Sequence, residues 1–217
     1  MKPVIYFDIE TGPLPEDQIR IPPFDPAEVK LGNVKDPAKI EAKLKAAEAN
    51  HRQSIIDNAA LDALTGQVLM IAYHVRGEAA SVAIHGKPEA EILTEWWALV
   101  TRFDRCPFVI GFNIKGFDLP FLVRRSWALG VVVPGWIRQG RYWHDFIIDI
   151  REMWQLGDNR ARGSLEAVSQ HLGLGGKSGD GALFYKLYAE DPAAAVAYAL
   201  RDVELTEAIH NRIAGGF

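Results

Sequence analysis

Two acidic residues stand at the end of a strand that the sequence predicts to be buried. Residues 3–9, Pro-Val-Ile-Tyr-Phe-Asp-Ile, are mostly β-branched or aromatic, and turn-forming residues follow at 11–13. Such a run is typical of a central strand that is covered on both faces. Since side chains alternate along a strand, Asp8 and Glu10 should point to the same face. Two buried carboxylates repel each other and lose hydration, which favours cations between them. On this pair alone, a strand end that frays into solvent is the alternative.

The order of the remaining elements predicts an α/β fold. A hairpin of two strands should follow the first strand, and then a helix, a strand, a helix, a strand and further helices. Crossover helices after an initial meander predict a mixed central sheet of about five strands flanked by helices. The expected strands cover 67–76, 79–85, 108–112 and 146–150, and the expected helices cover 89–103, 118–129, 150–156, 164–172 and 192–213.

Residues 13–64 interrupt this order, and we expect them to form an insertion in one domain that covers residues 1–217. Six prolines between positions 13 and 37 predict a long loop. The stretch rich in Ala, Lys and Glu that starts at Asp36-Pro37 predicts a helix to about Leu64, with Asp36 as its cap. At about 150 residues per domain, a chain of 217 residues favours a single domain.

The composition excludes several classes of protein. With 48% apolar and 24% charged residues, the chain is neither collagen-like, coiled-coil nor wholly disordered. A single cysteine, Cys106, excludes an intramolecular disulfide and a thiolate zinc cage, and it favours a reducing cytoplasm. We expect no export signal and no membrane helix, which would need about 20 apolar residues. A net charge of −4 means that a nucleic acid would have to be bound by local groups.

Two further motifs place acidic residues at positions that could address one site. Asp118 follows residues 111–117, Gly-Phe-Asn-Ile-Lys-Gly-Phe, where a strand should end and a helix begin. Capping of that helix is the alternative role for Asp118. Tyr198 and Asp202 lie four residues apart in the last expected helix, so a phenol and a carboxylate share one face. An exposed helix face is the alternative for this pair.

Taken in order, the three motifs resemble those of the DEDD 3′–5′ exonucleases. They are Phe-Asp-Ile-Glu-Thr at 7–11, Asn-Ile-Lys-Gly-Phe-Asp at 113–118 and Tyr-Ala-Leu-Arg-Asp at 198–202. The last motif resembles that of the tyrosine subclass. The whole looks most like the stand-alone proteins related to the proofreading domains of family B DNA polymerases. The resemblance implies a ribonuclease H-like fold and two-metal hydrolysis of a phosphodiester at a 3′ end.

The resemblance also implies a role for each of the five side chains in these motifs. Asp8, Glu10 and Asp202 would hold the ion that activates water. Asp8 would bridge to a second ion supported by Asp118, and Tyr198 would orient the attacking water. Mg²⁺ and Mn²⁺ both prefer oxygen ligands, so two ions of either kind are the expected cofactors. All four carboxylates are therefore expected metal ligands.

The substrate is expected to contact the same motifs. Thr11, Asn113 and Phe117 match positions that lie near the terminal nucleotide in the family that the chain resembles. Residues 124–162 hold seven arginines against four acids, the one local basic bias that could bind phosphates. At most one or two of the aromatic residues in this stretch should stack on bases. Asp149 could approach the cluster, but no motif assigns it a metal. These aromatic residues are Trp127, Trp136, Tyr142, Trp143, Phe146 and Trp154.

The sequence thus favours a metal-dependent 3′–5′ exonuclease that releases nucleoside 5′-monophosphates, with single-stranded DNA as the expected substrate. A ribonuclease that trims RNA 3′ ends would use the same side chains, since only contacts to the 2′-hydroxyl would distinguish it. A non-catalytic interaction platform on the same fold is another alternative, and intact carboxylates argue against it. An endonuclease or transposase of the ribonuclease H-like class is disfavoured by the spacing from Tyr198 to Asp202. Protein partners are left open.

Overall fold

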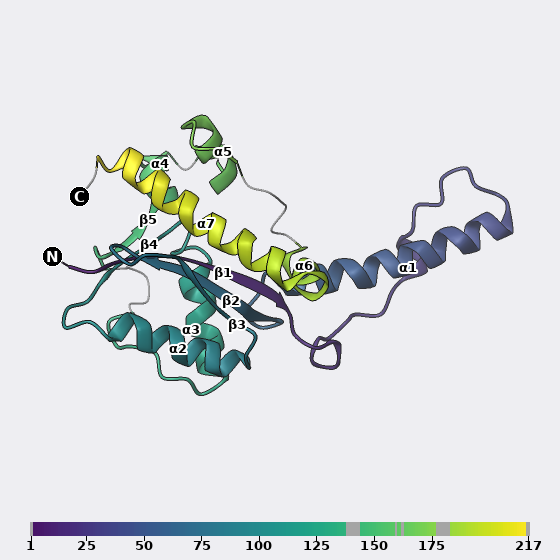
Figure 1. The fold of residues 1–217 in the computed structure, drawn as a ribbon. Coiled ribbons are helices and arrows are strands. Elements are labelled where there is room, and N and C mark those ends of the chain that lie inside the picture. Colours follow the sequence, from purple (N-terminus) through teal and green to yellow (C-terminus); the bar gives the residue numbers. More distant parts are fainter. Residues whose placement is uncertain (1, 138–143, 159, 162, 177–182, 216–217) are drawn as a thin grey trace. The chain divides into compact units, whose positions relative to one another are not determined.

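The structure is a computed structural model that describes residues 2–137, 144–158, 160–161, 163–176 and 183–215. The chain divides into two compact units, one formed by residues 1–11 and 68–217 and the other by residues 12–67. Figure 1 shows the elements of both units. In the described part of the chain, no helix is both long enough and apolar enough to cross a membrane.

A mixed sheet of five strands forms the centre of the larger unit. Its order is β3-β2-β1-β4-β5, so β1 occupies the middle. The strands β2 and β3 form the expected antiparallel hairpin, whereas β4 runs parallel to both β1 and β5. This arrangement confirms the α/β fold with a mixed sheet. The strand bounds are β1 Val4–Pro13, β2 Gly66–Val75, β3 Val82–His85, β4 Phe108–Gly111 and β5 Ile147–Asp149.

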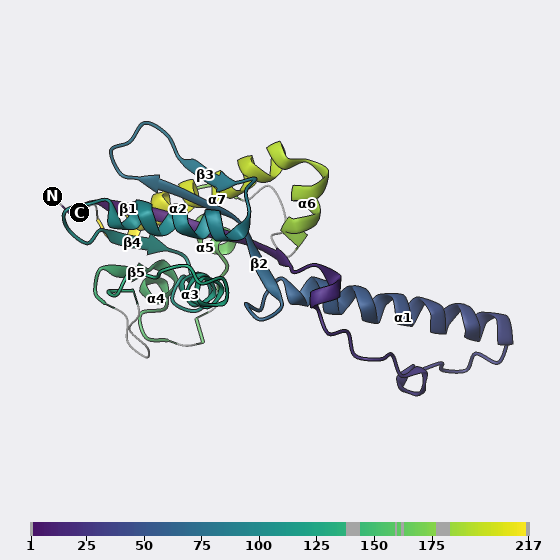
Figure 2. The same cartoon turned by 90° about the horizontal axis from the view of Figure 1, so that it is seen from below.

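Helices cover both faces of this sheet. In Figures 1 and 2, α7 lies on one face, and α2 and α3 lie on the other. The short helices α4, α5 and α6 all pack against α7. The bounds are α2 Glu89–Thr101, α3 Asp118–Ala128, α4 Ile150–Gln155, α5 Leu165–His171, α6 Phe184–Glu190 and α7 Pro192–Ile213.

The alternation of side chains along β1 decides which helix each residue meets. The Tyr6 hydroxyl lies 3.0 Å from Nδ1 of His210 on α7. Phe7 points the other way, and its ring centroid lies 4.7 Å from that of Trp96 on α2. Both rings are fully buried. Even-numbered residues of β1 therefore face α7.

A glycine at the end of β4 lets the chain turn closely against β1. A Cβ atom at Gly111 would lie 2.2 Å from Cγ2 of Ile114 and 2.8 Å from the carbonyl oxygen of Phe7. Side-chain atoms do not tolerate such distances, so only glycine fits here. Two residues later, Asn113 adopts a left-handed conformation with φ of 65°. Asn tolerates this region better than most residues. Together these two residues set the path of the loop from β4 to α3.

The smaller unit, residues 12–67, contains the expected proline-rich loop and helix. Two 3₁₀ turns, Glu16–Gln18 and Pro26–Glu28, precede the helix α1, Pro37–Ala59. The Asp36 carboxylate accepts the N–H of Ala38 at 3.0 Å, which confirms Asp36 as the cap. The helix ends before the expected Leu64 because residues 60–65 turn, and the Gly66 N–H donates to the Asp62 carbonyl. That this unit is an insertion in an exonuclease domain remains a prediction.

Other elements also differ from the sequence-based expectations. The strand expected at 3–9 continues to Pro13, through the residues that were expected to form a turn. The strand expected at 79–85 begins only at Val82, because residues 76–81 form the turn of the hairpin. The helix α6 was not predicted. Its N-cap Leu183 makes no side-chain capping bond, and Phe184 is its only buried residue, so it carries neither a start signal nor an apolar stripe.

Candidate functional site

Three carboxylates from β1 and α7 come together at the C-terminal half of β1. Asp8 and Glu10 share the face of β1 that meets α7, and α7 contributes Asp202. One carboxylate oxygen from each lies within 4.8 Å of the others. Glu10 is 7% exposed and Asp202 is 2% exposed, whereas Asp8 is half-buried. The alternative of a strand end that frays into solvent is therefore wrong.

Tyr198 precedes Asp202 by about one turn of α7 and lies on the same side of the helix. Both side chains are buried, so the alternative of an exposed helix face is also wrong. The Tyr198 ring packs beside Phe184, with 6.1 Å between ring centroids. This apolar contact restrains the ring on one side.

Asp118 contacts the backbone of β1 from the start of α3 and does not cap that helix. The N-cap is Phe117, which makes no side-chain capping bond, so the capping alternative is wrong. Instead the Oδ1 atom of Asp118 accepts the backbone N–H of Ile9 at 3.1 Å. Asp118 is 3% exposed and lines the same pocket as Asp8. The structure thus ties the start of α3 to the strand segment between Asp8 and Glu10.

Burial raises the pKa of Asp118 from 3.8 to about 7. The hydrogen bond from Ile9 opposes this shift, and the negative charge of Asp149 adds to it. Without a cation, the carboxylate is therefore only partly ionised at neutral pH. A divalent ion beside it would favour the charged form.

This shift predicts that Asp118 destabilises the metal-free protein at high pH. Because the folded-state pKa lies above the unfolded-state value, its contribution to stability falls as the pH rises from about 4 to about 7. We expect Asp118→Asn, measured in EDTA, to raise Tm by about 5 °C at pH 8, corresponding to about 2 kcal/mol, and to have no effect near pH 4.

Melting curves at both pH values, with the exposed Asp104→Asn as the control, test this prediction. Asp104→Asn should leave Tm unchanged at both values. Equal melting temperatures of wild type and Asp118→Asn at pH 8 would contradict it.

Asp149 organises the loop that carries Asn113. Its carboxylate accepts three backbone N–H groups, from Asn113 at 2.8 Å, Lys115 at 3.0 Å and Arg151 at 2.9 Å. It is 3% exposed, and burial raises the pKa of its carboxyl group. The sequence assigned no metal to Asp149. The structure shows that its carboxylate instead binds the backbone of the loop after β4 and the start of α4. Pairing of Asp149 with Gly111 across β5 and β4 brings it to this loop.

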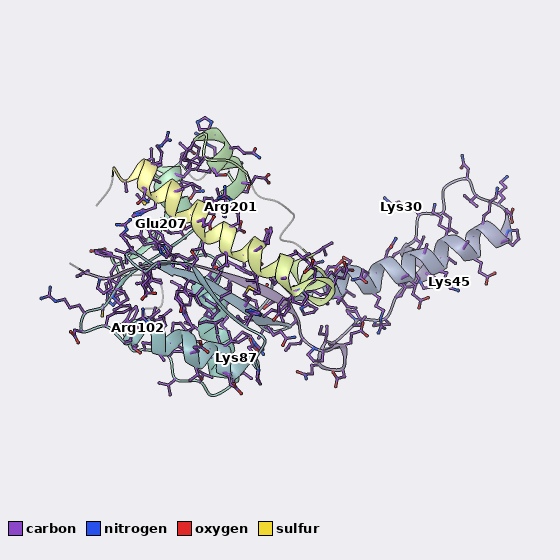
Figure 3. The ribbon with its side chains drawn as sticks, in the orientation of Figure 1. Lys30, Lys45, Lys87, Arg102, Arg201 and Glu207 are labelled. Carbon is purple, nitrogen blue, oxygen red and sulfur yellow. The ribbon has the colours of Figure 1, made fainter. Side chains whose placement is uncertain are left out.

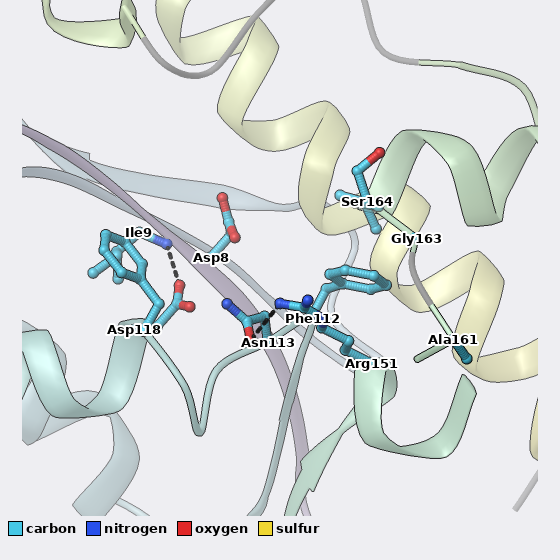
Figure 4. Close-up of a pocket in the computed structure, with 11 residues that line it drawn as sticks. Asp8, Ile9, Phe112, Asn113, Asp118, Arg151, Ala161, Gly163 and Ser164 are labelled. Atoms are coloured by element: carbon cyan, nitrogen blue, oxygen red, sulfur yellow. Dashed lines mark hydrogen bonds between the residues drawn. The ribbon is translucent and has the colours of Figure 1, made fainter. Parts of the chain in front are cut away.

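A pocket of about 750 Å³ opens beside Asp8 and Asp118. Figure 4 shows Asn113 between Asp118 and Arg151, with Ser164 and Gly163 on the far wall. Phe117 also lines the pocket and packs against Phe121, with 5.5 Å between ring centroids. The lining residues are Asp8, Ile9, Phe112, Asn113, Phe117, Asp118, Arg151, Ala161, Gly163, Ser164 and Leu165.

The other residues that were expected to contact the substrate either do not line this pocket or lie outside the described part of the chain. Thr11 is 9% exposed and is not among the residues that line the pocket. Trp127, in contrast, is 62% exposed. Trp136 packs edge-on against Phe146. Several residues expected near a substrate lie outside the described part: Arg138, Arg141, Tyr142, Trp143 and Arg162.

The chemistry of the trio fits a hard divalent cation. All three groups offer carboxylate oxygens, and oxygen ligands are what Mg²⁺ and Mn²⁺ prefer. Holding three acids so close without a cation would be costly, because two of them are buried. The residues present therefore fit the expected metal.

Fold and site together define an α/β domain with an acidic centre where β1 meets α7. The acidic centre consists of Asp8, Glu10 and Asp202. Residues 61–214 match a family described as "Predicted 3'-5' exonuclease related to the exonuclease domain of PolB". Since this match covers most of the chain, the chain belongs to that family. Its members are predicted nucleases, and nuclease relatives act on nucleic acid.

The fold is similar to that of a solved polymerase structure. The chain aligns over 99% of its length with the family B DNA polymerase from the hyperthermophilic archaeon Pyrobaculum calidifontis, with a TM-score of 0.63 and 19% sequence identity. It spans 25% of that polymerase chain. This likeness confirms the ribonuclease H-like fold. A search of curated proteins found no match.

The residues that match the family include only part of the site. The matched residues include Asp118, Tyr198 and Asp202, but they begin after Asp8 and Glu10. The tertiary structure supplies the connection, because it places Asp8 and Glu10 beside Asp202. The first motif is thereby linked in space to the part of the chain that defines the family.

Proposed function

We propose that this protein is a metal-dependent 3′–5′ exonuclease of the tyrosine subclass that releases nucleoside 5′-monophosphates from single-stranded DNA. The observation that carries the proposal is the convergence of Asp8, Glu10 and Asp202, with oxygens within 4.8 Å of one another. Membership of a family of predicted 3′–5′ exonucleases supports the direction of cleavage. The pocket beside Asp8 offers room for a terminal nucleotide.

In this proposal the carboxylates hold the cofactor. Asp8, Glu10 and Asp202 would hold one divalent ion, and Asp8 and Asp118 would hold a second. When bound, such ions would supply Lewis-acid chemistry to a water molecule and to the departing 3′ oxygen. The buried position of Asp202 and the hydrogen bond from Ile9 to Asp118 keep the ligands oriented before any ion arrives.

The chain's other groups position the reactants. Tyr198, fixed by its contact with Phe184, orients the attacking water through its phenol. Phe117 and Asn113 on the pocket wall contact the terminal nucleotide, one through an aromatic face and the other through an amide. An unpaired end enters such a pocket without the cost of separating a base pair, which favours single-stranded DNA.

Digestion of 5′-labelled oligonucleotides tests the proposal. With Mn²⁺, we expect wild type to shorten single-stranded DNA stepwise from the 3′ end, and to degrade the matching RNA more slowly. Asp8→Ala should abolish the ladder. Tyr198→Phe should slow it by up to ~10²-fold, since it removes a positioning contact without removing an ion ligand.

A phenol elsewhere on the protein provides the matched control for Tyr198. Tyr188→Phe, on α6, removes a hydroxyl that bonds His85 at 3.1 Å, and it should leave the rate unchanged. Internal cuts, or no cleavage of either polymer, would overturn the proposal. Faster degradation of RNA than of DNA would overturn the choice of substrate.

A further inference from the structure

The pocket beside the acidic centre contains one basic side chain among the described residues that line it. This residue is Arg151, from the first turn of α4. The pocket also holds Asp8 and Asp118, so a cation stands among anions that the proposed reaction uses. The sequence counted Arg151 only as one of seven arginines in a basic stretch.

Two hydrogen bonds fix the position of Arg151. Its backbone N–H donates to Oδ1 of Asp149 at 2.9 Å, and its Nη1 donates to Oδ1 of Asn113 at 3.1 Å. Asn113 is itself tied to Asp149, through its backbone N–H at 2.8 Å. Figure 4 shows Arg151 directed toward Asn113 at the pocket wall. The guanidinium is thus oriented by groups that also shape the pocket.

The acids next to Arg151 are engaged elsewhere. Asp149 accepts three backbone N–H groups, and Glu152 forms an ion pair with Lys115 at 2.7 Å. Over the ranges that the structure describes, no carboxylate forms an ion pair with Arg151. Arg125, in contrast, pairs with Glu89 at 2.7 Å. A guanidinium has five N–H donors in a planar fork, and Asn113 uses one of them, so donors remain for an anion.

We propose that Arg151 forms an anion subsite that binds a backbone phosphodiester of the strand whose 3′ end lies at Asp8 and Asp118. The inference rests on the proposed function and adds a phosphate contact to it. A planar fork matches the geometry of a phosphate oxygen pair. The contact involves no sugar hydroxyl, so it serves DNA and RNA alike.

Salt dependence of binding tests the subsite without any hydrolysis. Anisotropy of a fluorescein-labelled oligothymidylate is measured in EDTA over a KCl series. Each phosphate neutralised on a single strand contributes about 0.7 to the slope of log affinity against log salt. Arg151→Gln should therefore reduce the slope by about 0.7 and weaken binding about tenfold at low salt, whereas Arg151→Lys should keep the slope.

An arginine far from the pocket provides the control. Arg102, which is labelled in Figure 3, directly follows α2. It lies near Pro3, and its ion pair is with Glu78. Arg102→Gln should leave the slope unchanged. An unchanged slope in Arg151→Gln would overturn the subsite. If Arg151→Gln keeps the wild-type slope but has a lower Tm than wild type, the role of Arg151 is only to hold Asn113 in place.

The same proteins separate failure of the subsite from failure of the proposed function. If wild type binds the oligonucleotide with the predicted Arg151 dependence but does not cleave it with Mn²⁺, the exonuclease proposal fails and the subsite stands. If wild type cleaves while Arg151→Gln keeps the wild-type slope, the subsite alone fails. Absence of binding by wild type would overturn the subsite, whereas cleavage with Mn²⁺ alone decides the exonuclease proposal.

Discussion

Replacing Asp202 by Asn is expected to lower the cleavage rate at least ~10³-fold with little loss of stability. The side chain keeps its size, but the acidic centre loses one of the three carboxylates whose oxygens lie within 4.8 Å of one another. Removal of a single charge-stabilising group from an active site already costs about 10²–10³-fold. Asp202 should cost more, because it is proposed to hold the ion that activates water. Single-turnover digestion of labelled single-stranded DNA measures the effect.

A second readout follows binding of the ion directly. An ion that binds only the folded state, at about 100 times its Kd, stabilises the protein by about 2.7 kcal/mol. For wild type with Mn²⁺ we expect Tm to rise by about 8 °C, and for Asp202→Asn by much less. The matched control is Glu204→Gln, two residues further along α7, whose exposed carboxylate pairs with Arg201 at 3.0 Å. A wild-type rate or a wild-type Mn²⁺ shift in Asp202→Asn would contradict the metal assignment.

Replacing Arg125 by Met is expected to destabilise the fold by about 3–5 kcal/mol, lowering Tm by about 10 °C or more. Arg125 and Glu89 join α3 to the start of α2 through two hydrogen bonds, at 2.9 and 2.7 Å. Each side chain is only 8% exposed. Without the guanidinium, the Glu89 carboxylate is left buried with the N–H of Val68 as a remaining partner, at 2.8 Å. Denaturant unfolding measures the loss.

The neighbouring residue on the same helix supplies the control. Arg124 is exposed, so Arg124→Met should change stability by less than about 0.5 kcal/mol. The double variant Glu89→Leu with Arg125→Met should recover part of the loss, because it leaves no uncompensated buried charge. Equal stability of Arg125→Met and wild type would show that the pair contributes nothing.

The elements with strong local signals could be predicted from the sequence. The helix at 192–213 matches α7 at both ends, since Asp191 caps it before Pro192 and accepts the N–H of Ala194. The first strand was recognisable from its β-branched and aromatic residues, and the hairpin from two runs around Gly77, which adopts φ of 96°. In contrast, α6 has no capping side chain and buries only Phe184, so nothing local marks it.

The candidate site divides in the same way. Alternation along β1 was enough to predict that Asp8 and Glu10 share a face. The contact of Asp118 with the Ile9 N–H was not predictable, because it joins residues 109 positions apart. The roles of Asp149 and Arg151 were equally hidden. Both depend on the register of β5 beside β4, which brings Asp149 next to the loop after Gly111.

The sequence by itself determined the mixed α/β order, because periodicity, turn residues and caps act between near neighbours in the chain. It also predicted, through motifs that resemble those of a known family, the side chains that we propose to carry the chemistry. Only the tertiary structure decided that Asp118 bonds β1 instead of capping α3, and that Arg151 enters the pocket. These outcomes depend on strand register and on helix packing across the sheet. Such contacts join residues far apart in the chain, and no local pattern encodes them.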